Sequence, residues 1–227
     1  MVVGNGLVAR EMKRFETDGS VIVFASGVSN STNSDKSEFE REKSLLLSFK
    51  NSEKLLVYFS TLSVFDPSLL NSPYIQHKKE IEELIPRNFE RFLIFRLPIL
   101  VGKTENPKTL TNFLYNKIKN QDSFELQVNA RRFLFDSIDM AFWCGMMIDD
   151  SKYHNQIIDI YSGSSIGVKS IVHFLEEIIG TKANYIELLR GSSYEGNNMV
   201  FDELLSIHGM KIPEDYPKQV LAKYYRK

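Results

Sequence analysis

The chain has 227 residues, of which 43% are hydrophobic and 25% are charged, and its formal net charge is -1. This is the composition of an ordinary globular protein with one ample core, and the near-zero charge argues against nucleic-acid binding through bulk charge. The single cysteine, Cys144, excludes a disulfide framework within the chain, and no Cys or His cluster has the spacing of a zinc site. With no signal peptide and no apolar run of membrane length, we expect a cytoplasmic protein.

The first predicted elements are a short strand at residues 1–3, a glycine turn and a helix from Leu7 to Phe15. The turn reads Gly4-Asn5-Gly6-Leu7-Val8-Ala9, a G-x-G-x-x-A sequence. In a dinucleotide-binding turn, the first glycine permits the tight bend and the second lets the backbone approach a pyrophosphate. The alanine lets the helix pack close to the strand. The pattern alone is weak, and an ordinary turn is the alternative.

Strands and helices then alternate along the chain. Apolar runs predict strands at 21–25, 55–61 and 91–97, and periodic apolar positions predict helices at 38–49 and from Pro73 to Ile85. This alternation predicts a parallel sheet with helices on both faces. The residues Ala25-Ser26-Gly27 follow the second strand, and small residues there let a flat ligand lie against the backbone.

The pattern becomes less regular after Gly102. We expect helices at 110–118, 138–148, 170–179, 200–207 and 216–225, and strands at 124–128, 133–135, 156–161 and 185–189. No repeat and no linker divides the chain, so we expect one compact unit.

Tyr74 and Lys78 are the strongest candidates for chemistry. Four positions apart on a helix, they share one face. An ammonium beside a tyrosine favours the phenolate and lowers the tyrosine pKa, which suits proton exchange with an alcohol or ketone oxygen. Thr61, at the end of a predicted strand, could hold the same oxygen. The alternative is an exposed Tyr and Lys on a solvated helix.

Taken in order, these pieces resemble the extended short-chain dehydrogenase/reductase superfamily. More narrowly, the chain is similar to the NAD-dependent epimerase/dehydratase group that acts on nucleotide-linked sugars. The segments that carry the resemblance are Gly4–Ala9, Val57–Phe65, Tyr74–Lys78, Arg96–Gly102 and Arg132–Asp139.

The resemblance implies a Rossmann-like fold, NAD(H) or NADP(H) as cofactor and a nucleotide sugar as substrate. Residues 1–102 would mainly bind the cofactor, and residues 103–227 would mainly form a small substrate-binding α/β lobe with segments that return to the sheet. It also implies a place in deoxysugar and polysaccharide biosynthesis.

The resemblance also assigns roles to single residues. Tyr74 matches the acid/base tyrosine, Thr61 the hydroxyl that binds the reacting oxygen, and Lys78 the lysine that also holds the nicotinamide ribose. Arg132 matches an arginine that binds the diphosphate of the substrate, with a plain surface charge as the alternative. The residues that match cofactor-binding positions are Gly4, Gly6, Leu7, Val8, Ala25, Ser26, Gly27, Pro98 and Leu100.

The chain departs from the family in several places. The family has two further strands and a helix between the glycine-turn helix and the strand at 21–25, and here there is no room for them. The acidic residue that grips the adenosine ribose is also missing. Arg10, with Lys13 and Arg14, would suit a 2′-phosphate, or would simply form a solvated helix face. Asp66 stands where the family has Gly.

The loop between Thr61 and Tyr74 is also short, so we expect a sugar pocket open on that side. A dehydratase of this family has an Asp-Glu pair directly after the threonine, where this chain has Leu62-Ser63. Dehydration is therefore set aside.

These features favour an NAD(P)H-dependent 4-ketoreductase of a nucleotide-linked 4-keto-6-deoxysugar, because the missing strands should ease cofactor exchange. A 4-epimerase with tightly bound NAD and a non-catalytic dinucleotide-binding protein are the alternatives. We also expect a homodimer formed through the helices at 38–49 and 74–86, and NADPH serving at least as well as NADH.

Overall fold

The computed structural model describes residues 1–226 and places five parallel strands in one sheet, in the order β1-β2-β3-β4-β9. Their bounds are Val2–Val3 for β1, Val21–Phe24 for β2, Leu55–Thr61 for β3, Phe92–Leu97 for β4 and Gln156–Asp159 for β9. Strand β3 lies at the centre, and every residue from Leu55 to Ser60 is buried. Strands covered on both faces read as continuous apolar runs, which is why these segments could be recognised in the sequence.

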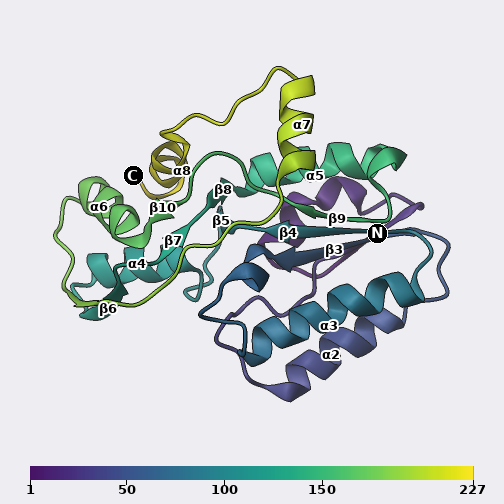
Figure 1. Cartoon of the computed structure of the whole chain (residues 1–227), viewed down its shortest axis with the longest axis horizontal. Helices are drawn as coiled ribbons and strands as arrows, with labels where there is room; N and C mark the ends of the chain where they lie inside the picture. The colour runs from purple at the N-terminus through teal and green to yellow at the C-terminus, as the bar shows by residue number, and fades with distance from the viewer. Residues whose placement is uncertain (227) are drawn as a thin grey trace.

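Helices cover both faces of this sheet (Figure 1). Helices α2 (Lys36–Leu47) and α3 (Pro73–Asn88) lie side by side on one face, where Ile81 and Ile85 pack against β2, β3 and β4. Helices α1 (Leu7–Glu11) and α5 (Ser137–Asp149) lie on the other face. Cys144 of α5 is fully buried there, in the largest hydrophobic core cluster of the described residues.

The second half of the chain builds a smaller lobe at one end of the sheet, seen at the left of Figure 1. Its helices are α4 (Leu110–Lys119), α6 (Val168–Ile179) and α8 (Tyr216–Tyr225). Its strands form three pairs: β5 (Ile99–Val101) with β8 (Leu134–Asp136), β6 (Phe124–Gln127) with β11 (Tyr185–Leu188), and β7 (Arg131–Arg132) with β10 (Ile166–Gly167). Helix α7 (Met199–Ile207) packs against β9 instead.

The predicted fold class is confirmed: the chain is a Rossmann-like α/β protein with a parallel sheet and helices on both faces. The sheet is also shortened as expected, since β2 pairs directly with β1 and β1 is the edge strand of the described sheet. Strand β9 returns from the second half of the chain to pair with β4. The predicted helix from Leu7 to Phe15 is wrong in detail, because α1 ends at Glu11 and a 3₁₀ turn follows at Lys13–Phe15.

Candidate active site

A cavity of about 960 Å³ opens where strands β1 to β4 end. Each strand contributes the residues that directly follow it, as expected at the carboxyl edge of a parallel sheet. The lining includes these predicted site residues: Gly6, Leu7, Val8, Ala25, Ser26, Gly27, Thr61, Tyr74, Lys78, Pro98, Leu100 and Arg132. A second cavity, of about 440 Å³, lies at the end of α6 around Gly180, far along the chain from these residues.

The glycine turn forms one wall of the larger cavity. Gly4 has a φ of +127°, and a Cβ there would lie 2.4 Å from the carbonyl oxygen of Ala25, so only glycine fits between β1 and β2. Gly6 lines the cavity, and an added Cβ would meet no atom within 4 Å. The turn therefore presents bare backbone to the open space, which is what a pyrophosphate requires.

Thr61 and Tyr74 both line the cavity. Thr61 is the last residue of β3, and Tyr74 lies in the first turn of α3, which begins at Pro73 and is capped by the Ser72 hydroxyl. The Thr61 hydroxyl is close enough to Tyr74 to act on its pKa, which it lowers. The Tyr74 side chain is buried, which excludes the alternative of an exposed tyrosine on a solvated helix.

Lys78 lies one turn further along α3, with its Nζ 5.9 Å from the centre of the Tyr74 ring. The ammonium is buried and donates to Tyr58 Oη at 2.7 Å and to Glu42 Oε1 at 3.1 Å. The predicted shared face of Tyr74 and Lys78 is thus confirmed, but the lysine charge is already compensated. Glu42 is the partner that the sequence did not reveal.

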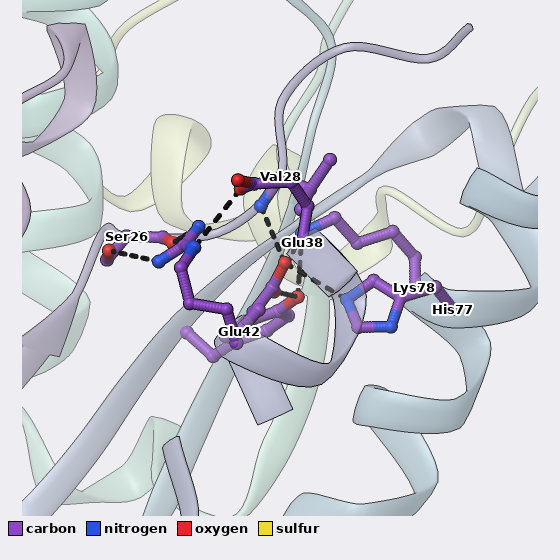
Figure 2. A network of polar contacts seen from close by, with 8 residues as sticks. Ser26, Val28, Glu38, Glu42, His77 and Lys78 are labelled. Carbon is purple, nitrogen blue, oxygen red and sulfur yellow. Dashed lines mark hydrogen bonds and ion pairs between the residues drawn. The ribbon is translucent and has the colours of Figure 1, made fainter. Parts of the chain in front are cut away.

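Glu42 comes from α2 and is fully buried. Its Oε1 also accepts a hydrogen bond from Tyr58 Oη at 2.6 Å, and its Oε2 accepts from the Val28 amide at 2.5 Å. His77 Nε2 lies 3.0 Å from Oε2, completing the network in Figure 2. Burial alone would raise the pKa of Glu42, but the Lys78 charge and these hydrogen bonds hold the pKa at about 2.

The expectation of a lowered Tyr74 pKa is wrong. Burial raises the pKa of Tyr74 and the nearby Glu42 charge raises it further, while the Thr61 hydrogen bond opposes them. Burial also lowers the pKa of Lys78, with Glu42 opposing that change. The lysine has its own carboxylate, so it does not act on the tyrosine as an isolated cation.

Arg132, from β7, also lines the cavity. Its Nη2 lies 3.1 Å from Asp66 Oδ2, and its guanidinium carbon lies 5.1 Å from the centre of the Tyr194 ring. Asp66 is fully buried but paired with Arg132 and hydrogen-bonded by the Ser68 and Ser192 hydroxyls, which gives a physical reason for an acid at this position. Arg132 is therefore an ion-paired cavity residue and not a plain surface charge.

The side of the cavity beside the loop between Thr61 and Tyr74, where we expected an open sugar pocket, is more covered than expected. The segment after β11 crosses the short loop between Thr61 and Tyr74. Ser192 donates to Asp66, and Tyr194 Oη lies 3.2 Å from Ser63 Oγ. The expectation of an open side is wrong. The loop is short, but a segment more than 100 residues further along the chain covers it.

The basic residues near the N-terminus point elsewhere. Arg10 donates to the carbonyls of Asn5 at 3.3 Å and Lys103 at 2.8 Å, and it is not among the lining residues of the cavity within residues 1–226. Arg14 forms an ion pair with Asp149 at 2.8 Å. A role for Arg10 toward the cofactor stays a prediction, and its observed partners do not favour it.

Several cavity residues were missed by sequence reasoning. Arg41 of α2 lines the cavity and donates to Ser26 Oγ and Ser26 O, each at 3.3 Å. Residues 106–110 and Phe113, from the start of the second lobe, close another side. One signal could have revealed Glu42. Phe39, Glu42 and Leu46 follow one another at intervals of three and four residues, so they lie on one face of α2, and a charged residue on that apolar face is unusual.

Comparison with known proteins rests on structure alone. No protein-family model matches the sequence, and no curated protein matches it. Among solved structures, the chain superposes on UDP-glucose 4-epimerase of Thermus thermophilus in complex with NAD, with a TM-score of 0.70 and 11% identity over 97% of this chain and 83% of that one. It also superposes on RMD of Pseudomonas aeruginosa in complex with NADPH, with a TM-score of 0.71 and 12% identity over 99% of this chain and 97% of that one.

A reductase gives a similar result. The dTDP-4-dehydrorhamnose reductase of Bacillus anthracis, in complex with NADP, superposes with a TM-score of 0.69 and 15% identity over 96% of this chain and 84% of that one. The chain shares their fold. At these identities the match establishes the fold, and chemistry has to be argued from the residues in the cavity.

Proposed function

We propose that this protein is an NAD(P)H-dependent reductase of a nucleotide-linked 4-keto-6-deoxysugar, of the type that converts dTDP-4-keto-6-deoxyglucose to a dTDP-fucose. The observation that carries the proposal is the buried Tyr74 hydroxyl at the wall of a large cavity, with Thr61 beside it and a raised pKa that keeps it protonated. The fold shared with nucleotide-sugar epimerases and reductases, several of them in complex with NAD or NADPH, supports the cofactor and substrate class.

The cavity residues fit a nicotinamide dinucleotide. The bare backbone of the Gly4–Gly6 turn would hold the pyrophosphate, and Ala25-Ser26-Gly27 would line the cofactor on the next strand. Pro98 and Leu100 line the cavity beyond β4, where the nicotinamide would meet the backbone. The bound nicotinamide would supply a hydride to the carbonyl carbon of the substrate.

The chain itself supplies the proton and the orientation. As charge develops on the substrate oxygen, Tyr74 donates its hydroxyl proton to that oxygen, and the Thr61 hydroxyl helps to hold the oxygen in place. Lys78 presents its ammonium at the cavity wall, where a ribose hydroxyl could accept from it. Arg132 would face the diphosphate of the substrate, with its own charge partly balanced by Asp66.

The two alternatives predict different behaviour of the purified protein. A 4-epimerase would retain NAD and turn over without added cofactor, and it needs a base to begin by oxidising an alcohol. A non-catalytic binding protein would bind the dinucleotide and transform nothing. The protonated state of Tyr74 favours the reductase.

The test is to incubate the purified protein with NADPH or NADH and a small set of nucleotide-linked keto sugars, and to follow the loss of reduced nicotinamide absorbance. We expect consumption of reduced cofactor with at least one 4-keto-6-deoxysugar nucleotide, and almost none with Tyr74→Phe. Interconversion of sugar epimers without added cofactor would instead support the epimerase.

A further inference from the structure

The buried Glu42 has no role in the mechanism above, yet both of its carboxylate oxygens are engaged by neighbouring side chains and backbone. Its two carboxylate oxygens take contacts from Lys78, Tyr58, His77 and the Val28 amide, all within 3.1 Å (Figure 2). A buried charge is costly unless it is paired and hydrogen-bonded, and Glu42 meets both conditions. The arrangement holds its position through partners on α3, on β3 and in the loop after β2.

The contacts of Lys78 limit what its charge can do. One proton of the ammonium goes to Glu42 and one to Tyr58, and Gly27 lies so close that an added Cβ would be 2.9 Å from Nζ. Glu42 thus stands within hydrogen-bonding distance of the charge, whereas the Tyr74 ring centre is 5.9 Å away. Because Glu42 is paired with Lys78, its negative charge opposes the attraction that Lys78 would exert on a Tyr74 phenolate.

We propose that Glu42 is a positioning residue: it holds Lys78 in an ion pair and adds to the effect of burial in opposing a phenolate at Tyr74, so that the free enzyme presents a hydroxyl able to give a proton to a substrate oxygen. This inference rests on the proposed function, and it concerns the protonation state in which the enzyme meets its substrate. With Glu42 in place, the form that can donate a proton to a ketone oxygen is the one populated at neutral pH.

The remaining groups around Tyr74 do not favour its phenolate over its hydroxyl form. Tyr194, from the covering segment, and Thr61, from β3, are uncharged neighbours. Glu82, one turn beyond Lys78, is itself paired with Arg96 at 2.6 Å. The titratable and charged groups that face the Tyr74–Lys78 pair are therefore Glu42, Tyr58, His77, Glu82 and Tyr194.

During ketone reduction the Oη–H bond of Tyr74 breaks and an O–H bond forms on the substrate oxygen, while the carbonyl carbon gains the hydride of the reduced cofactor. Tyr74 is left as a phenolate and recovers a proton from solvent before the next turnover. In the opposite direction the phenolate must come first, and Glu42 opposes its formation by repelling the charge.

The decisive measurement uses the protein alone, without cofactor or substrate. Phenolate absorbance is followed as pH rises, for wild type, Glu42→Gln, Tyr74→Phe and the double variant Glu42→Gln/Tyr74→Phe. Wild type and Tyr74→Phe should have the same titration curve up to a pH of about 10, the ordinary tyrosine pKa. Glu42→Gln should gain a phenolate signal at a pH about 1–2 lower than in wild type, and the double variant should lose that signal.

Two controls separate charge from shape. Glu82→Gln removes another buried carboxylate of the same region that does not contact Lys78, and it should leave the Tyr74 titration unchanged. Glu42→Asp keeps the charge and should restore the wild-type curve. If Glu42→Gln does not fold, wild type against Tyr74→Phe still decides: a tyrosine that ionises near neutral pH in wild type, and is absent from Tyr74→Phe, overturns the proposal.

The result of the titration does not depend on whether the proposed substrate is the right one. If no keto sugar nucleotide is reduced, the proposed function fails, but the titration still reports on Glu42. If reduction is observed and Glu42→Gln titrates like wild type, the function stands and the role of Glu42 is overturned.

Discussion

Gly27 shows how one residue joins the cavity to the buried charge network. A Cβ at this position would lie 2.9 Å from Lys78 Nζ and 3.0 Å from Glu42 Oε1, both of them buried. We therefore expect Gly27→Ala to force the pair apart and to lower the free energy of unfolding by about 1–3 kcal/mol, the usual cost of overpacking. Chemical denaturation measures this.

The matched control for Gly27→Ala is Gly19→Ala. A Cβ on Gly19 would meet no atom within 4 Å, and the residue is exposed. Gly19→Ala should change stability by much less. Equal losses in the two variants would mean that the space at Gly27 is not set by Glu42 and Lys78.

Tyr74→Phe tests the proton donor directly. The variant keeps the ring and its packing against Val28, Phe39 and Ile75 but deletes the hydroxyl, so the fold should survive. Turnover should fall by about 10²–10⁴-fold with a much smaller change in KM, because the proton is given mainly in the transition state. Steady-state kinetics with a keto sugar nucleotide would show it.

Two further variants rank the neighbours of Tyr74. Thr61→Val removes one hydrogen bond and no proton source, so it should cost less turnover than Tyr74→Phe. Lys78→Ala should also lower turnover, and it leaves Glu42 as an unpaired buried charge, so its loss of stability must be measured beside its activity. A Tyr74→Phe protein with near wild-type turnover would remove Tyr74 from the mechanism.

At the scale of elements, the strands and helices of the sheet were readable because their patterns are local. Strand β3 is a run of seven residues, six of them buried, and α3 begins with a Ser-Pro start signal and a periodic apolar face. The two-residue pairing of β7 with β10 could not be predicted, because segments that short carry no periodic pattern.

The site residues also fall into those that local sequence patterns predict and those that they do not. Thr61, Tyr74 and Lys78 could be predicted, since Tyr74 and Lys78 share one helix and Thr61 ends the strand before it. The roles of Glu42 and Tyr194 could not be assigned, because each reaches the site only by tertiary packing. Glu42 lies 36 positions before Lys78, and nothing in the charged sequence from Glu38 to Lys43 distinguishes it from a solvated residue except its place on the Phe39–Leu46 stripe. The lysine looked unpaired in sequence for that reason, and the predicted direction of the Tyr74 pKa was wrong.

Helix α2 also changes which basic residue is expected to discriminate between cofactors. Arg41 lines the cavity next to Ser26, whereas Arg14 is engaged by Asp149. We still expect NADPH to serve at least as well as NADH, with Arg41 now the best-placed partner for a 2′-phosphate. Arg41→Ala should raise the KM for NADPH more than that for NADH, with Arg10→Ala as the comparison. If Arg10→Ala raises the KM for NADPH more than Arg41→Ala does, Arg10 is the better candidate for contact with the 2′-phosphate.

At the scale of the whole molecule, the predicted homodimer through α2 and α3 loses part of its motivation. Within residues 1–226, none of the large apolar side chains classed as exposed lies on either helix, and an ion pair between Lys43 and Glu80 bridges them. If α2 and α3 do pair between two copies, the interface would be polar and weak. Sedimentation should then show a concentration-dependent mixture of monomer and dimer, and a strict monomer at micromolar concentration would contradict the dimer.

The shortened sheet leads to a prediction about cofactor retention. Strand β1 is the edge of the described sheet, so the wall that two further strands would give to the adenosine half of a dinucleotide is absent. Lys78, Pro98 and Leu100, which we propose meet the nicotinamide half, do line the cavity. Affinity should therefore be modest and exchange fast, as a reductase requires when it must release oxidised cofactor in each turnover.

The corresponding experiment is to denature the purified protein and quantify the released NAD(H) and NADP(H) per chain. We expect much less than one equivalent, because a cofactor held through only part of its length dissociates during purification. Tyr74→Phe serves as the matched control, since it should leave cofactor contacts in place and retain no more than wild type. One full equivalent of NAD in both proteins would mean that the truncated wall is compensated elsewhere, and it would favour the epimerase, which keeps its NAD through the catalytic cycle, over the reductase.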